Sequence, residues 1–236
     1  MENIKVKTIL SKGNTNAKTA KNSLETFIMY LSPYNLNSKG INICPKASKG
    51  CAAACLYTAG RGAFSNVQKA RQNKTEHYLN DKKAFVLQLS YEILKQYTKA
   101  KKLNKKIAFR LNGTSDIDFI YLLQKYADLD VSTLKDFAVF YDYTKILGKA
   151  KKYLGHPNYF LTFSRAEDND KETNEAIGLR INVAAVFGGD LPTMYKGAKV
   201  INGDSSDILM IYNKGVILGL KAKGKARKDT SGFVIN

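Results

Sequence analysis

The chain has 236 residues, 44% of them hydrophobic, which is enough to bury the core of a complete domain. No stretch approaches the roughly 18 consecutive apolar residues of a membrane helix, and the first residues lack the apolar centre of a signal peptide. These features predict a cytoplasmic protein with no membrane partner. The 38 Lys and Arg residues against 20 Asp and Glu give a net charge of +18. This excess predicts a polyanionic partner, nucleic acid first, although a biased genome would produce the same Lys- and Asn-rich balance.

The sequence has the organisation of a single domain, 1–236. It contains no internal repeat, low-complexity tract or linker rich in Pro and Gly, and only four prolines occur. Nothing therefore marks a domain boundary.

All three cysteines lie in one predicted loop, 41–62, as Cys44, Cys51 and Cys55 with the spacing C-x6-C-x3-C. A helix would place Cys51 and Cys55 on one face, and turn-forming Pro and Gly residues would let the loop bring Cys44 over them. Three converging thiolates suit a metal centre. A 4Fe-4S cluster held by three cysteines leaves one iron open to a small molecule.

Two other interpretations of the cysteines stay open. Zinc would need a fourth ligand, from His77, His156 or an acid, and none has a zinc-finger spacing. Alternatively, the thiols are small buried side chains that pack a helix.

Gly60-Arg61-Gly62 ends the cysteine loop. Backbone N–H groups beside the Arg61 guanidinium fit an anion-binding site, and an ordinary glycine hinge is the alternative.

The next segment predicts helix. Apolar positions recur at three- and four-residue spacing over 65–102, and Asn80-Asp81 interrupts the pattern, which predicts two helices. We therefore expect a long helical N-terminal region.

The remainder alternates short runs of β-branched and aromatic residues with helical segments. The predicted strands are 107–111, 137–141, 159–163, 183–187, 199–201 and 216–220. Helical segments at 120–126 and 144–153 separate the first of them, as in parallel βαβ units. We expect an α/β fold with mostly parallel strands, arranged as a partial (βα) barrel.

Polar residues follow three successive predicted strands, where such folds carry their chemistry. Asp116 follows the first, Thr144 and Lys145 follow the second, and Ser164 follows the third. Helix N-caps are the alternative interpretation of each.

Two stretches concentrate the positive charge. One contains Lys95, Lys99, Lys101, Lys102, Lys105 and Lys106, and the other lies in the basic C-terminal segment 219–236. Either fits a phosphate backbone, and the second also fits a solvated tail.

These features together resemble the phage gene product 88 family. The resemblance is carried by the cysteine loop with Leu56-Tyr57 and Gly60-Arg61-Gly62, then by Thr114-Ser115-Asp116, Tyr143-Thr144-Lys145 and Phe163-Ser164-Arg165. It covers roughly 22–169 and extends into the C-terminal segment. It implies a bacteriophage context, with a bacterial host cell as the location, and constrains the fold more than the chemistry.

The same order of features is similar to the radical S-adenosylmethionine enzymes, and among them to spore photoproduct lyase. That resemblance implies that the three cysteines hold a 4Fe-4S cluster whose open iron binds S-adenosylmethionine. It implies Asp116 near the methionine amino group, and Lys145 and Ser164 at the carboxylate or ribose. The usual cysteine spacing of these enzymes is C-x3-C-x2-C, from which this chain departs.

The sequence supports two hypotheses. The first is an enzyme of radical S-adenosylmethionine type that acts on or with nucleic acid. Its candidate cofactor-binding residues are Asp116, Thr144, Lys145, Ser164 and Arg61. The second is a non-catalytic phage nucleic-acid-binding or replication protein whose cysteine–metal site only stabilises the fold.

Overall fold

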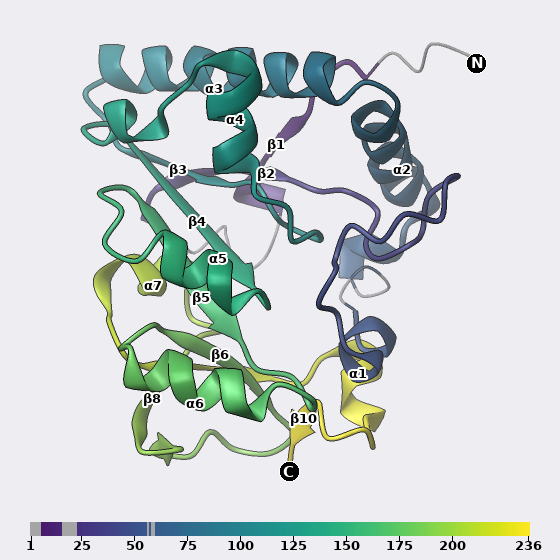
Figure 1. Ribbon diagram of the computed structural model, residues 1–236, viewed down its shortest axis with the longest axis vertical. Helices are drawn as coiled ribbons and strands as arrows, with labels where there is room; N and C mark the ends of the chain where they lie inside the picture. The colour runs from purple at the N-terminus through teal and green to yellow at the C-terminus, as the bar shows by residue number, and fades with distance from the viewer. Residues whose placement is uncertain (1–5, 16–22, 56, 58–59) are drawn as a thin grey trace.

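The computed structural model describes residues 6–15, 23–55, 57 and 60–236, and a mostly parallel sheet lies at its centre (Figure 1). Within these residues the sheet has ten strands in the order β1-β2-β3-β4-β5-β6-β9-β8-β7, and β10 pairs with β6. The strands are β1 (Leu10–Lys12), β2 (Glu25–Met29), β3 (Ile107–Arg110), β4 (Ala138–Thr144), β5 (Tyr159–Ser164), β6 (Val183–Phe187), β7 (Met194–Tyr195), β8 (Ala198–Asn202), β9 (Ile217–Lys221) and β10 (Val234–Ile235). The pairs β1–β2 and β7–β8 are antiparallel, and the other pairs are parallel.

The predicted α/β class with mostly parallel strands is confirmed. The six predicted strands are present as β3, β4, β5, β6, β8 and β9. The outermost strands of this order, β1 and β7, do not pair with each other, so the described strands form an open sheet and a barrel is not confirmed.

Along the chain, the helices alternate with these strands. They are α1 (Lys49–Ala53), α2 (Ser65–Asn80), α3 (Lys82–Lys102), α4 (Phe119–Ala127), α5 (Leu147–Lys152), α6 (Asp170–Gly178) and α7 (Leu209–Tyr212). Short 3-10 helices span Gly13–Thr15, Gly60–Ala63, Val131–Leu134 and Gly224–Lys228.

The two predicted helices of 65–102 are confirmed as α2 and α3. Asp81 separates them: its N–H donates to the His77 carbonyl at 2.9 Å, and its carboxylate accepts from the Ala84 N–H at 2.9 Å. It thus closes one helix and caps the next. Two unpredicted strands, β1 and β2, precede these helices, so the expected long helical N-terminal region is not seen. The run that forms β2 is as short as the predicted strands, but it stands apart from their alternation with helices, because the cysteine loop, α2 and α3 separate it from β3.

Each face of the sheet has its own core because side chains alternate along a strand. Ile107 and Phe109 of β3 pack on the side of α3 and α4, whereas Ala108 faces the opposite side with Met210 of α7. Since both faces are covered, the parallel strands are continuous apolar runs. Among the described helices, none is long and apolar enough to cross a membrane.

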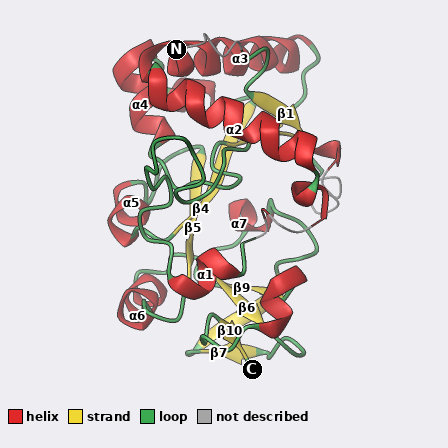
Figure 2. Cartoon of the chain, turned by 90° about the vertical axis from the view of Figure 1, so that its right-hand side faces the viewer, coloured by secondary structure: helices red, strands yellow, loops and turns green. Residues whose placement is uncertain are grey.

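The parallel direction of β2 to β6 brings their carboxyl ends to one edge of the sheet, here called the carboxyl edge. Two segments cover it: loop 30–48 with α1, and the C-terminal segment 222–236. Figure 2 faces this edge and shows α1 between α2 and β10. Buried Ala54, just after α1, packs with Val234 of β10. The cysteine loop and the C-terminus therefore meet at this edge.

Candidate functional site

Cys44 lies over the end of β3. The Asp116 N–H donates to the Ile43 carbonyl at 3.0 Å, which ties the cysteine loop to the loop that follows β3. The Cys44 thiol is 3.6 Å from the Thr114 carbonyl oxygen, and the Tyr34 N–H donates to the sulfur at 3.4 Å. Cys44 is thereby held at the carboxyl edge.

Cys51 is held over the end of β5. It lies in α1, and its N–H donates to the Ser48 hydroxyl oxygen that caps this helix, at 3.1 Å. Glu167, in the loop after β5, accepts from the Ser48 hydroxyl at 2.7 Å and from the Gly50 N–H at 2.6 Å. Burial acts to raise the pKa of Glu167, but these hydrogen bonds outweigh it, and the pKa lies below its ordinary value.

Cys55 follows α1 rather than lying in it. The helix ends at Ala53, so the expectation that one helix carries both Cys51 and Cys55 was wrong. The Cys55 N–H still donates to the Ala52 carbonyl, at 3.4 Å, which continues the turn. Leu56, Thr58 and Ala59 of the predicted loop lie outside the described residues.

The three cysteines form no disulfide, and their thiols are partly buried and electrostatically coupled. The pKa of Cys44 is raised to about 11, chiefly by burial and also by the nearby Cys55 and Cys51, while the hydrogen bond from Tyr34 acts to lower it. Burial and Cys51 also raise the pKa of Cys55, whereas Arg71 and Lys145 act to lower it. The thiols and two cations thus share one neighbourhood. In the part of the chain that the structure describes, no group of three or more His, Cys, Asp or Glu side chains is close enough to hold a metal ion, so metal binding stays a prediction.

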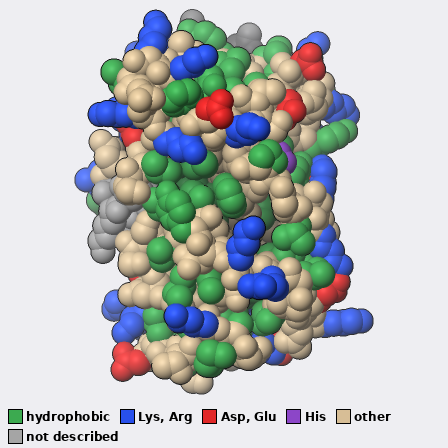
Figure 3. All heavy atoms as spheres, turned by 90° about the vertical axis from the view of Figure 1, so that its left-hand side faces the viewer, with side chains coloured by type: hydrophobic (Ala, Val, Ile, Leu, Met, Phe, Trp, Pro, Cys, Tyr) green, Lys and Arg blue, Asp and Glu red, His purple; other side chains and the backbone are tan. Residues whose placement is uncertain are grey.

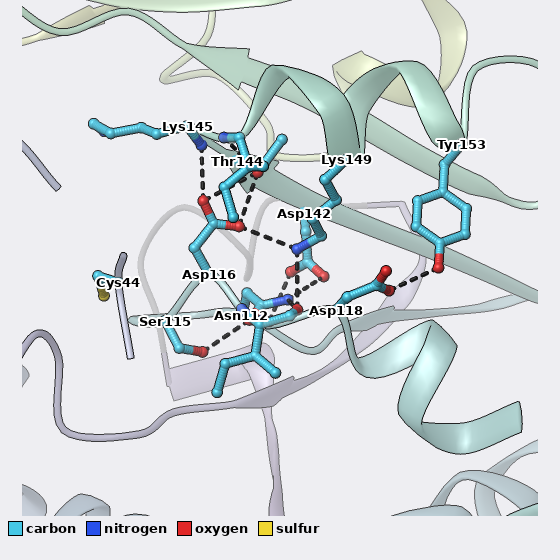
Figure 4. Close-up of polar contacts among 12 residues, drawn as sticks. Cys44, Asn112, Ser115, Asp116, Asp118, Asp142, Thr144, Lys145, Lys149 and Tyr153 are labelled. Atoms are coloured by element: carbon cyan, nitrogen blue, oxygen red, sulfur yellow. Dashed lines mark hydrogen bonds and ion pairs between the residues drawn. The ribbon is translucent and has the colours of Figure 1, made fainter. Parts of the chain in front are cut away.

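Asp116 and Thr144 are brought together, with Lys145 and Lys149 (Figure 4). The Thr144 hydroxyl donates to the two Asp116 carboxylate oxygens at 2.8 and 3.0 Å. The Lys145 N–H donates to Asp116 at 2.8 Å, and the buried Lys149 ammonium does so at 3.1 Å. Both oxygens of this carboxylate, which is 9% exposed, accept from the chain's own donors. The N-cap residue of α4 is Asp118 and that of α5 is Ile146, so neither Asp116 nor Thr144 has the helix-capping role of the alternative interpretation.

A second buried carboxylate shapes the loop that presents Asp116. Asp142 of β4 accepts from the Asn112 N–H at 2.7 Å, from the Asn112 side chain at 3.0 Å and from the Tyr159 hydroxyl at 3.3 Å. Burial raises the pKa of Asp142. The Asn112 side-chain oxygen in turn accepts from the Ser115 hydroxyl and from the Ile117 N–H.

The Lys145 side chain, Ser164 and Arg61 lie apart from the Asp116 carboxylate. The Lys145 side chain extends away from it in Figure 4, and its ammonium lies 5.6 Å from the centre of the Phe233 ring. Side chains alternate along β5, so Ser164 lies on the same face of the sheet as Thr162, whose hydroxyl contacts Met210. Thr144 lies on the opposite face. Arg61 is exposed in its 3-10 helix.

Sequence reasoning missed Arg71, which lies at the same edge. It is on α2 and only 9% exposed, and its guanidinium stacks on Tyr30, after β2, at 4.6 Å and on Tyr57 at 5.5 Å. Its spacing with Thr75 and Tyr78, both buried, was the available signal that it faces inward. Glu167 was also missed as a site residue, since its partner Gly50 is 117 positions away.

The chain is thus a mixed α/β protein whose parallel sheet carries three cysteines at its carboxyl edge. The model of the gene product 88 family matches residues 8–236, so the chain belongs to that family, in a bacteriophage context. The match extends over nearly the whole chain and confirms the predicted family. Searches of curated proteins and of solved structures found no match.

Proposed function

We propose that Cys44, Cys51 and Cys55 bind an iron–sulfur cluster, a 4Fe-4S cluster being the form that three cysteines suit. One observation carries the proposal: three cysteine thiols, none of them in a disulfide, lie within electrostatic reach of one another at the carboxyl edge. Thiolates are the soft ligands that iron–sulfur clusters and zinc select. Burial raises the pKa of Cys55, and the charges of Arg71 and Lys145 act against that rise, toward the thiolate, which is the ligating form. Zinc is the alternative metal and would need a fourth ligand.

The first candidate activity is that of a radical S-adenosylmethionine type enzyme on a partial (βα) barrel, acting on or with nucleic acid. A bound cluster would supply an iron open to a small molecule. The support from the chain is that Lys145 follows β4 at the same edge as the cysteines, and its ammonium, which forms no ion pair with any described residue, can attract a carboxylate.

The second candidate is a non-catalytic nucleic-acid-binding or replication protein whose metal site stabilises the fold. The occupied Asp116 carboxylate favours it, because Thr144, Lys145 and Lys149 already donate to both oxygens. A residue that receives a cofactor's ammonium would need an oxygen for it.

Anaerobic purification with iron, sulfide and zinc analysis and a visible spectrum tests the metal proposal. We expect iron and sulfide with the wild-type chain, and loss of most of both in each single Cys→Ser variant. Asp118→Asn is the control, because Asp118 lies in the same region but binds Lys152 and Tyr153. Wild-type protein that holds neither iron nor zinc after anaerobic reconstitution would refute a metal centre.

The two candidates separate on the reconstituted protein. An enzyme binds S-adenosylmethionine in calorimetry and releases 5′-deoxyadenosine on reduction. If it does neither, and Asp116→Asn still binds nucleic acid, the second candidate stands.

A further inference from the structure

Arg71 has buried hydrogen-bond donors for which no described residue provides an acceptor. Its Nε and Nη1 atoms are inaccessible to solvent and have no hydrogen-bond partner among the described residues. Arginine keeps its charge at all physiological pH values, so proton loss does not relieve this. Buried donors without acceptors are rare in native structures, and a missing ion is one recognised cause.

The surroundings of Arg71 orient the guanidinium without neutralising it. Tyr30 and Tyr57 contact its planar face, and such stacking leaves the N–H edge available. The helix that carries it is anchored, because Thr75 donates to the Arg71 carbonyl at 2.9 Å and accepts from the Ser32 N–H at 2.8 Å. A fixed, charged plane of donors is therefore preformed.

The acids of the carboxyl edge are committed elsewhere. Asp116 binds Thr144, Lys145 and Lys149, and Glu167 binds Ser48 and Gly50. Among the described residues Arg71 forms no ion pair. The neighbourhood of Cys55 thus holds two cations, Arg71 and Lys145, with positive charge that the described acids do not match.

We propose that Arg71 anchors a binding site for a small ligand carrying an oxyanion, a carboxylate or a phosphate, beside Cys55. Planar guanidinium donors match both groups in geometry and charge. Lys145 places a second positive charge near the Cys55 thiol. The site does not depend on a metal at the cysteines, because the unmatched donors belong to the protein alone.

Thermal unfolding of the full chain, stripped of metal with a chelator, tests this site. Sodium chloride is replaced stepwise by sodium phosphate in one series and by sodium acetate in another, at constant pH and ionic strength. We expect a saturable rise in Tm with one anion or both. At ten times the Kd the folded-to-unfolded ratio rises about 11-fold. A rise with acetate alone identifies a carboxylate ligand, and a rise with phosphate identifies a phosphate.

Two variants test whether the rise in Tm comes from Arg71. Arg71→Gln should lose the saturable rise, whereas Arg180→Gln, which removes an exposed guanidinium outside the candidate site, should keep it. An equal rise in Arg71→Gln, or no saturable rise with either anion in the wild type, would overturn the proposal.

A measurement on the wild type covers the case in which Arg71→Gln does not fold. In protein labelled with ¹⁵N-arginine, Arg71→Lys identifies the Arg71 Nε–H signal by its disappearance. That signal should shift in the wild type as the anion saturates, while the Arg180 signal, identified in the same way from Arg180→Gln, should not. An Arg71 signal that stays unchanged contradicts the site.

Discussion

Gly113 shows how one residue positions the neighbourhood of Arg71. A Cβ at this position would lie 2.7 Å from Tyr30 Cε1 and 2.8 Å from the Met29 carbonyl oxygen. Both distances are closer than real Cβ contacts. Tyr30, which stacks on Arg71, therefore keeps its place because residue 113 has no side chain.

We expect Gly113→Ala to lower the free energy of unfolding by about 1–3 kcal/mol, as overpacking does. Gly148→Ala is the matched control, since Gly148 lies in α5 with nothing near its missing Cβ, and alanine is the better helix former. Urea unfolding measures both. Equal stability of the two variants would show that Tyr30 is not confined by Gly113.

Cys44 carries a prediction on pH. Its pKa in the folded protein, about 11, is above the ordinary value of 9.0, chiefly because of burial. The raised pKa adds to the free energy of unfolding. This contribution is fully present below pH 9 and is lost as the pH rises through 11. It also lowers the thiolate fraction at pH 8 about 100-fold, since each pKa unit is a factor of ten.

In metal-free protein at pH 8 we expect iodoacetamide to modify Cys44 at least 100-fold more slowly than in the urea-unfolded chain, because the thiolate is the reactive form. Peptide mass spectrometry over time gives the two rates. Similar rates would mean that the thiol is neither buried nor shifted in pKa.

At the scale of elements, the short helix α1 is held from outside. Five residues are too few for a helix to be stable by itself, so its tertiary contacts keep it in place. Glu167 supplies two of them through Ser48 and Gly50, and the C-terminal segment packs on Gly50. The position of Cys51 thus depends on a residue that follows β5.

We expect Glu167→Gln to destabilise the fold by about 1–2 kcal/mol, because hydrogen bonds to a charged group are replaced by weaker neutral ones. The Gly50 and Cys51 amides should exchange with solvent faster, as hydrogen-exchange mass spectrometry can measure. Asp168→Asn, at an exposed neighbouring acid, should leave both unchanged. Unaltered exchange in Glu167→Gln would show that α1 does not depend on this carboxylate.

At the scale of the whole molecule, the two basic stretches differ in how they are paired. Lys221 and Lys223 of the C-terminal stretch bind Asp190 and Asp204. The lysines at the end of α3 are exposed and form no ion pair with any described residue; they are Lys95, Lys99, Lys101, Lys102, Lys105 and Lys106. Figure 3 shows Lys and Arg side chains spread over one face with few acids among them.

A hollow of about 440 Å³ lies between α3 and the start of β3, lined by Lys99, Lys105 and Lys106. If nucleic acid binds, this region is the stronger candidate, because its lysines form no ion pair with any described residue. It lies at the amino ends of the parallel strands, so it is separate from the cysteines.

We expect the double variant Lys99→Ala/Lys105→Ala to make the slope of log K against log salt concentration less steep by about two. Each lost phosphate contact removes about 0.9 from the magnitude of this slope. Lys221→Ala/Lys223→Ala lowers the net charge equally, from +18 to +16, and should change the slope little. Fluorescence anisotropy with labelled DNA and RNA across a salt titration measures both. Absence of wild-type binding at low salt would leave genome bias as the source of the charge.

Much of the fold could be predicted because its elements are local patterns. The break between α2 and α3 was predicted at Asn80-Asp81, where Asp81 indeed caps the second helix. The strand β2 was missed because it stands apart from the alternation of strands and helices that identified the others: the cysteine loop, α2 and α3 separate it from β3. For the candidate site, the pairing of Asp116 with Thr144 and Lys145 follows from the parallel order of β3 and β4, which the rhythm of the sequence predicted. Lys149 was not predicted as their partner.

The sequence by itself determined the α/β class, the positive charge and the gathering of all three cysteines in one segment, because periodicity, composition and spacing are local properties. Only the tertiary structure decided which groups meet. Glu167 holds Gly50 across 117 positions, and Arg71 on α2 stacks on Tyr30 after β2. Such pairs depend on strand order and on the paths of loops, which are set by the burial of both faces of the sheet and not by any pattern near either residue.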